Sequence, residues 1–158
     1  MLQRIQTIFL VIVAIGMGVF LALPLWEKTA TDGAQSASLT ALRLSHQTNA
    51  VQSQEQSVLY LAILAVVIAA VAIFAITRYR NRLLQSALCA ANSILMTVLL
   101  AGTIYQTYYK GARFFEPESP GDYLPGFYAL IVAMLANVLA NRFIRRDERM
   151  VKESNRMR

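Results

Sequence analysis

Four stretches of this sequence contain no Asp, Glu, Lys or Arg, and each is long enough to cross a lipid bilayer as a helix. They cover residues 5–26, 56–77, 83–109 and 123–141, which are 22, 22, 27 and 19 residues long. The hydrocarbon core of a bilayer is about 30 Å thick, so a helix needs about 20 apolar residues to span it. A soluble helix of this length would show a polar face, and none of these stretches does. The sequence therefore predicts four transmembrane helices.

Two other architectures agree less well with the pattern. A soluble bundle would need unusually long apolar helices, and outer-membrane strands alternate polar with apolar residues, whereas residues 61–76 are almost wholly apolar. We therefore expect an all-α membrane protein, an antiparallel up-down bundle of four helices in a single domain of residues 1–158. The expected spans are about 5–26, 56–77, 83–109 and 123–145, with outer loops at 27–55 and 110–122 and a tail at 146–158.

The basic residues predict the orientation. One side of the membrane receives residue Arg4, the turn around Arg80 and everything after residue 141, and it carries 11 of the 15 Lys and Arg residues. Cytoplasmic segments accumulate Lys and Arg, so we expect both termini in the cytoplasm. The aromatic residues Trp26, Tyr105, Tyr108, Tyr109, Tyr123, Phe127 and Tyr128 fall at the expected outer boundary, where amphipathic rings favour the interface.

The first span could instead be a signal peptide, because it follows Met1-Leu-Gln-Arg4 and then turns apolar. Its apolar run is longer than a usual signal core, and no clear small-x-small cleavage site follows closely. We therefore expect the span to be retained. Cleavage would leave the other three spans with the same orientation.

Small residues recur every three or four positions in three of the spans, which places each set on one helix face. Small side chains let helix backbones approach closely in lipid, so we expect these faces to point into a bundle or toward a partner. The first span offers only Gly16 and Gly18, which do not share a face. The sets are Ala62, Ala65, Ala69 and Ala72; Ser86, Ala90, Ser93, Thr97 and Ala101; and Ala129, Ala133, Ala136 and Ala140.

Polar residues inside the spans are few and neutral. Asn92 falls near mid-bilayer, and Asn137 lies about one turn inside Arg142. Such side chains usually hydrogen-bond between helices. The alternative is that Asn92 and Asn137 line a site for a ligand.

No pattern of residues indicates catalysis, a cofactor or a metal. No ionisable Asp, Glu, Lys, Arg or His lies within the four charge-free stretches, which argues against an ion-coupled transporter, and no CxxC motif appears. The single histidine, His46, is expected to be a solvated loop residue. The single cysteine, Cys89, is expected to be a small packing residue. We expect no enzymatic activity.

The extramembrane segments are short. The loop of residues 27–55 is rich in Gln, Ser, Thr and Ala, which suggests partial order at most, with a short strand or an interfacial segment at residues 38–44. The tail continues the fourth helix without Gly or Pro. Basic side chains there would attract anionic headgroups or dock a protein partner; the candidates are Arg78, Arg80, Arg82, Arg142, Arg145, Arg146 and Arg149.

The two ends of the chain resemble a known family. The most specific pieces are Arg4-Ile-Gln6 and the stretch from Ile144-Arg-Arg-Asp-Glu148 to Asn155-Arg156. They resemble an uncharacterised bacterial inner-membrane family catalogued as domain of unknown function 4293, over essentially the whole chain. The resemblance implies a small four-span protein and supplies no activity.

These observations favour a non-enzymatic accessory or scaffold subunit of a larger inner-membrane complex, which docks through small-residue helix faces and a basic cytoplasmic tail. The expected partners are membrane lipids and other membrane-protein subunits. Direct binding of nucleic acid is not expected, and a homo-oligomer is compatible with the sequence. The alternative is a small transporter or lipid-binding protein with a neutral polar cavity near Asn92 and Asn137.

Overall fold

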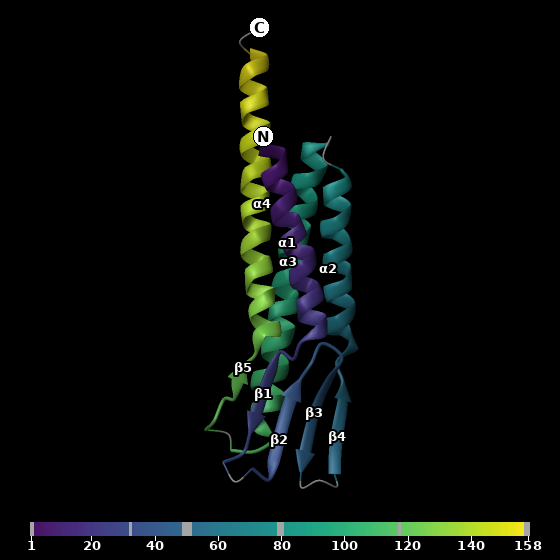
Figure 1. The fold of residues 1–158 in the computed structure, drawn as a ribbon, viewed down its shortest axis with the longest axis vertical. Coiled ribbons are helices and arrows are strands. Elements are labelled where there is room, and N and C mark those ends of the chain that lie inside the picture. The colour runs from purple at the N-terminus through teal and green to yellow at the C-terminus, as the bar shows by residue number, and fades with distance from the viewer. Residues whose placement is uncertain (1, 32, 49–51, 79–80, 117, 157–158) are drawn as a thin grey trace.

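The fold was analysed in a computed structural model of the chain, which describes residues 2–31, 33–48, 52–78, 81–116 and 118–156. For residues 2–4, 52, 53, 148, 149 and 151–156 the description covers the backbone only. Four long helices stand side by side, and a β-sheet covers one end of them (Figure 1). We call this the sheet end, and the opposite end, where the chain begins and finishes, the terminal end.

The helices are α1 (Leu2–Ala22), α2 (Leu59–Thr77), α3 (Arg82–Ile104) and α4 (Pro125–Arg156). Each is long and apolar enough to cross a membrane. The helix α1 packs against α2 and α4, and α3 packs against the same two neighbours on the other side. Pro24 follows the end of α1, as expected for a residue that cannot continue a helix, and the Asn81 side chain accepts a hydrogen bond from the Leu84 amide at the start of α3.

The expectation of an all-α protein is wrong, because the segment between α1 and α2 folds as strands. These are β1 (Trp26–Thr29), β2 (Gln35–Leu39), β3 (Arg43–Thr48) and β4 (Gln52–Ser57), and the short β5 (Asp122–Tyr123) precedes α4. They form one antiparallel sheet in the order β4-β3-β2-β1-β5. The strand expected near residues 38–44 is instead the turn of the β2–β3 hairpin, in which Leu39 pairs with Leu44.

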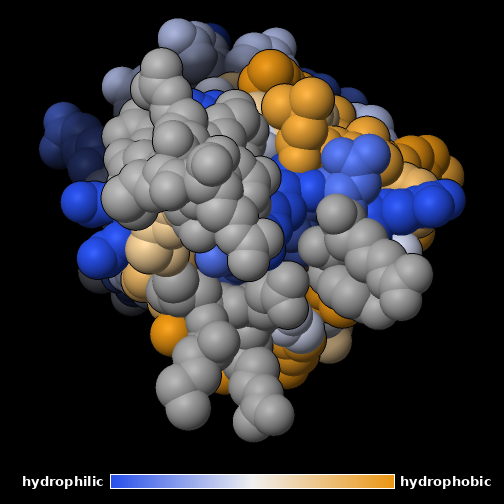
Figure 2. Space-filling model, turned by 90° about the horizontal axis from the view of Figure 1, so that it is seen from above, coloured by the Kyte–Doolittle hydropathy of each residue, from blue (hydrophilic) through white to orange (hydrophobic). Residues whose placement is uncertain are grey.

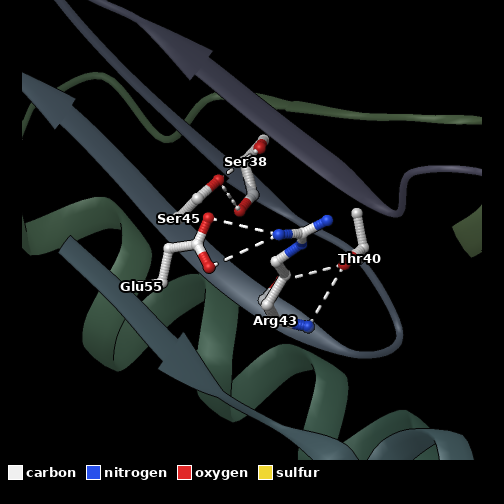
Figure 3. A network of polar contacts seen from close by, with 5 residues as sticks. All are labelled: Ser38, Thr40, Arg43, Ser45 and Glu55. Carbon is white, nitrogen blue, oxygen red and sulfur yellow. Dashed lines mark hydrogen bonds and ion pairs between the residues drawn. The ribbon is translucent and has the colours of Figure 1, made fainter. Parts of the chain in front are cut away.

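One face of the sheet is buried and the other is exposed, because successive side chains of a strand point to opposite faces. Its inner face presents Trp26, Ala37, Leu39 and Leu44, which are all buried in one core cluster together with residues of the four helices. Its outer face carries hydroxyl and charged groups, shown in Figure 3: Ser38 and Ser45 oxygens lie 2.8 Å apart, and exposed Arg43 pairs with Glu55 at 3.2 Å.

The third helix supplies the second layer beneath the sheet. After Ile104 it widens into a π-helical turn, Tyr105–Lys110, and then tightens into a 3-10 turn, Gly111–Arg113. These turns carry the chain past the ends of α1 and α2 and behind the strands (Figure 1). The sheet therefore rests on the third helical rod, and it is not an independent domain.

Candidate functional site

The two asparagines of the apolar helices lie inside the bundle. Asn137 on α4 is fully buried, and its amide nitrogen donates to the Cys89 carbonyl and to the Ser93 hydroxyl of α3, both at 2.9 Å. Asn92 on α3 is also buried, and neither polar atom of its side chain has a partner among the described residues. Both amides are therefore buried in the bundle: that of Asn137 links α4 to α3, and that of Asn92 is unsatisfied among the described residues.

The small-residue faces lie largely within the chain. Ala62, Ala65 and Ala72 of α2 are buried, Ala69 is half-buried and packs against the same core, and Ala133, Ala136 and Ala140 of α4 are buried. Ala129 is half-buried, and in α3 Ser86 is buried, Ala90 and Ser93 are half-buried, and Thr97 and Ala101 are exposed. The faces of α2 and α4 are thus occupied inside the monomer, so they are not free surfaces for a partner.

One contact shows why small residues are needed. A Cβ atom added to Gly16 of α1 would lie 3.0 Å from Ala133 Cβ and 3.2 Å from the Ala129 carbonyl oxygen of α4. The backbones of α1 and α4 therefore touch at this crossing. The same test at Gly18 meets nothing within 4 Å, so the two glycines of α1 differ in role.

The terminal end of the bundle is basic. The guanidinium of Arg82 pairs with the Asp147 carboxylate at 3.2 Å and also donates to the Asp147 carbonyl. Ser86 donates to Asn141 at 2.9 Å, and Arg145 Nε lies 3.4 Å from the Ser86 hydroxyl. Figure 2 looks onto this end and shows hydrophilic side chains between apolar helix surfaces.

Four of the predicted docking residues remain available there. Arg78, Arg142, Arg145 and Arg146 are exposed, and none forms a salt bridge within the described residues. Arg80 lies outside the described residues, and so does the side chain of Arg149. The terminal end thus presents arginine side chains that form no salt bridge within the described residues, and they lie beside apolar helix surfaces.

A buried lysine, which the sequence analysis did not single out, joins the sheet to the segment that follows α3. Lys28 on β1 is 2% exposed, and its Nζ donates to three main-chain carbonyls, those of Ala112 at 3.0 Å, Phe115 at 2.5 Å and Glu116 at 2.8 Å. Burial lowers the pKa of Lys28, and the negative charge of Glu116 opposes that shift. A signal existed in the sequence, because Lys28 follows Trp26 at the two-residue period of one strand face.

Glu116 completes this joint from the other side. Its carboxylate accepts hydrogen bonds from the Thr31 amide at 3.2 Å and the Thr31 hydroxyl at 3.1 Å. Its backbone has φ of 40°, a left-handed conformation that is uncommon for a residue with a side chain. Lys28 and Thr31 together hold the chain in this turn.

Two aromatic residues differ from expectation. His46 is not a solvated loop residue: it lies on β3, half-buried, with its ring stacked on Phe114 at 4.6 Å between centroids. Trp26 is not at a lipid interface but fully buried, and its Nε1 donates to the Pro120 carbonyl at 3.0 Å. Both rings help to pack the sheet onto the segment after α3.

No group of three or more His, Cys, Asp or Glu residues that could hold a metal ion occurs in the described part of the chain. Cys89 is free and buried. The candidate sites are therefore the amide pair inside the bundle and the basic terminal end.

Comparison with known families returns a match over nearly the whole chain. The family model described as "Domain of unknown function (DUF4293)" matches residues 2–157. Comparison with curated proteins returns no match.

Proposed function

This chain belongs to the DUF4293 family, and from that premise we propose that it is a non-enzymatic accessory or scaffold subunit of a larger complex in the bacterial inner membrane. The observation that carries the proposal is the length of α4. Asp147 marks the level at which α3 begins, since it pairs with Arg82, yet α4 continues to Arg156. About 14 Å of helix therefore extends beyond the bundle, at about 1.5 Å per residue.

This projecting end of α4 has no other helix of the bundle beside it (Figure 1). Most helical stability in proteins comes from tertiary packing of one helix face. The projecting segment stands clear of the other helices (Figure 1), and Met150 on it is 41% exposed. A partner surface that packs against this segment would supply the missing contacts.

The charges favour a cytoplasmic position for this end. Lys and Arg concentrate on the cytoplasmic side of membrane proteins, and here Arg78, Arg142, Arg145 and Arg146 surround the terminal end. The proposed topology therefore places both termini in the cytoplasm and the sheet outside. The exposed arginines would anchor the end in anionic headgroups, at roughly 1 kcal/mol each.

The docking surface differs from the one that the sequence favoured. The alanine faces of α2 and α4 are buried within the monomer, so they stabilise the subunit itself. The projecting end of α4 and the basic residues around it are the surface that we assign to the partner.

Purification in mild detergent tests the proposal. The full chain should co-purify with at least one other membrane protein, and a chain that ends at Asp147 should lose that protein. Ser38→Cys in a Cys89→Ser background provides a matched control, because Ser38 lies on the outer face of the sheet. This variant should keep the partner. A full-length chain recovered alone, or a partner that survives the truncation, would refute the docking surface.

The topology is tested with the same Ser38→Cys variant. An impermeant thiol reagent should label it in intact spheroplasts, whereas a cysteine placed at Met150 should react only after the membrane is opened. The reverse pattern would show that the orientation is inverted.

A further inference from the structure

Asn92 presents an unsatisfied amide in the middle of an apolar bundle. It is 1% exposed, and both its Nδ2 and its Oδ1 lack a partner among the described residues. A buried amide without hydrogen bonds is unfavourable, because it has lost its bonds to water without replacing them. In a membrane, water outside the bundle cannot relieve that cost. Something inside the bundle has to supply the missing donors and acceptors.

Asn137 extends the same polar layer. Its nitrogen bonds to Cys89 and Ser93, which lie three residues before and one residue after Asn92 on α3. The Oδ1 of Asn137 is buried and has no partner within the described chain. The Asn137 amide thus meets α3 within one helical turn of Asn92, and the two amides together leave two acceptor atoms and one donor nitrogen unpaired.

This layer lies between two separate apolar clusters. Met96, one turn from Asn92 toward the sheet end, belongs to the large cluster. Cys89, one turn toward the terminal end, belongs to a smaller cluster with Leu10, Ala75, Ala140 and Ile144. The polar layer thus interrupts the core.

The nearest further unpartnered polar atom lies toward the terminal end. Gln85 lies two turns, about 10 Å, from Asn92 in that direction, and its buried Oε1 has no partner in the described structure. The buried Gln6 Nε2, on the first turns of α1, is in the same state. Toward the sheet end the buried positions of α3 are Met96, Leu99 and Thr103, whose hydroxyl bonds to Leu99, and the next unpartnered atom, Gln106 Oε1, lies 14 residues, about 21 Å, from Asn92.

We propose that Asn92 and Asn137 form a blind binding site for a small neutral molecule that both donates and accepts hydrogen bonds, water or an organic solute, which enters from the terminal end past Gln85. The guest accepts from Asn92 Nδ2 and donates to the Oδ1 atoms of Asn92 and Asn137. Neutrality follows from the spans, because no Asp, Glu, Lys, Arg or His lies at this depth. The apolar cluster around Met96 closes the site, so it binds and does not conduct. This inference does not depend on the proposed function.

The native Cys89 reports on the site. Only a thiolate reacts rapidly with thiol reagents, and it forms where water reaches the sulfur. The full chain in lipid nanodiscs is treated with methyl methanethiosulfonate and followed by intact mass. Cys89 should react at least about tenfold faster than a cysteine moved two turns along α3 into the large apolar cluster, in the variant Cys89→Ala, Met96→Cys. Equal rates, or no reaction at Cys89, would overturn the proposal.

Asn92→Leu provides the second measurement, with Met96→Leu as the volume-conserving control. If the site holds a guest, Asn92→Leu slows labelling of Cys89 at least about tenfold and does not raise Tm, whereas Met96→Leu leaves the rate unchanged. If no guest binds and the Asn92 amide stays unsatisfied, Asn92→Leu should instead raise Tm. That result would refute the proposal. Native mass spectrometry separates the two kinds of guest. A mass retained by the wild type and lost in Asn92→Leu identifies a solute, and labelling without added mass identifies water.

Discussion

The ammonium nitrogen of Lys28 lies 4.9 Å from the centroid of the Phe115 ring, and it donates a hydrogen bond to the carbonyl oxygen of the same residue. One side chain from the first outer segment is thereby held by a residue 87 positions later in the chain. Together with the carbonyls of Ala112 and Glu116, this contact fixes the sheet on the end of the third helical rod.

Lys28→Met should destabilise the sheet end. The change keeps the aliphatic stem but removes the ammonium donor from the carbonyls of residues 112 and 115, while the carbonyl of residue 116 keeps its bond from the Ser119 amide. A buried acceptor without a donor costs about 1–3 kcal/mol. Thermal unfolding in detergent measures the loss. Arg43→Met is the control, because the Arg43–Glu55 pair is exposed and such pairs contribute roughly 1 kcal/mol or less. Equal losses of thermal stability in the two variants would show that Lys28 does not hold the sheet on the segment that follows α3.

The same lysine predicts a pH dependence. Burial lowers the pKa of Lys28 from its ordinary value of 10.5. Between the lowered value and 10.5 the unfolded chain binds more protons than the folded chain, so the unfolding free energy contributed by Lys28 rises with pH. Stability of the wild type relative to Lys28→Met should therefore increase with pH over the interval between the lowered pKa of Lys28 and 10.5. A difference that stays constant or falls over this interval would contradict the burial of the charge.

Gly16→Val should separate α1 from α4, because even a Cβ at this position comes within 3.0 Å of Ala133. Overpacking of this kind typically costs about 1–3 kcal/mol, which a lower Tm in detergent would report. Gly18→Val makes the same change of residue on the same helix, at a position open to at least 4 Å. It should leave Tm close to the wild-type value. Similar Tm values for the two variants would rule out a close crossing at Gly16.

Gly121→Ala should displace Trp26, the only tryptophan in the chain. A Cβ at Gly121 would lie 2.7 Å from the Trp26 ring, and the backbone there has φ of 75°. We expect red-shifted emission and stronger quenching by acrylamide than in the wild type, whose tryptophan is fully buried. Gly33→Ala introduces a comparable strain, at φ of 70° in open space, so it should lower stability without changing the emission. Emission that responds equally to both substitutions would argue against a specific contact.

The helices were predictable because a single physical rule, the exclusion of charge from hydrocarbon, acts along the sequence. The first helix nevertheless ends at Ala22, before the charge-free stretch does. Leu25 and Trp26 are apolar for a different reason, since they are buried beneath the sheet. Composition alone does not distinguish a side chain buried by lipid from one buried by protein.

The sheet escaped prediction because its apolar pattern is sparse. Only Ala37, Leu39 and Leu44 face inward as apolar residues on β2 and β3, and the polar neighbours of these residues read as a loop. The layer that buries them is formed by residues 105–115, far away in the sequence. The roles of Lys28 and His46 depend on the same distant segment, so local patterns could not reveal them.

The two buried asparagines were also only partly predictable from the sequence. Asn92 and Asn137 were identifiable as polar residues in apolar helices, but spacing along one helix does not determine which neighbour each side chain meets. Asn137 bonds across to α3, whereas Asn92 does not bond to any described residue. That difference, which depends on how the helices are rotated, became visible only in three dimensions.

The unbroken course of α4 has a mechanical consequence. The helix starts directly after β5, crosses α1 closely at Ala133 in its first third, packs on α1 and α3 as far as Asp147, and then projects from the bundle, with no glycine or proline after Gly126 to bend it. A stiff rod of this kind transmits a load on its projecting end along its length to the strand side. The two ends of the molecule are therefore mechanically coupled through a single element.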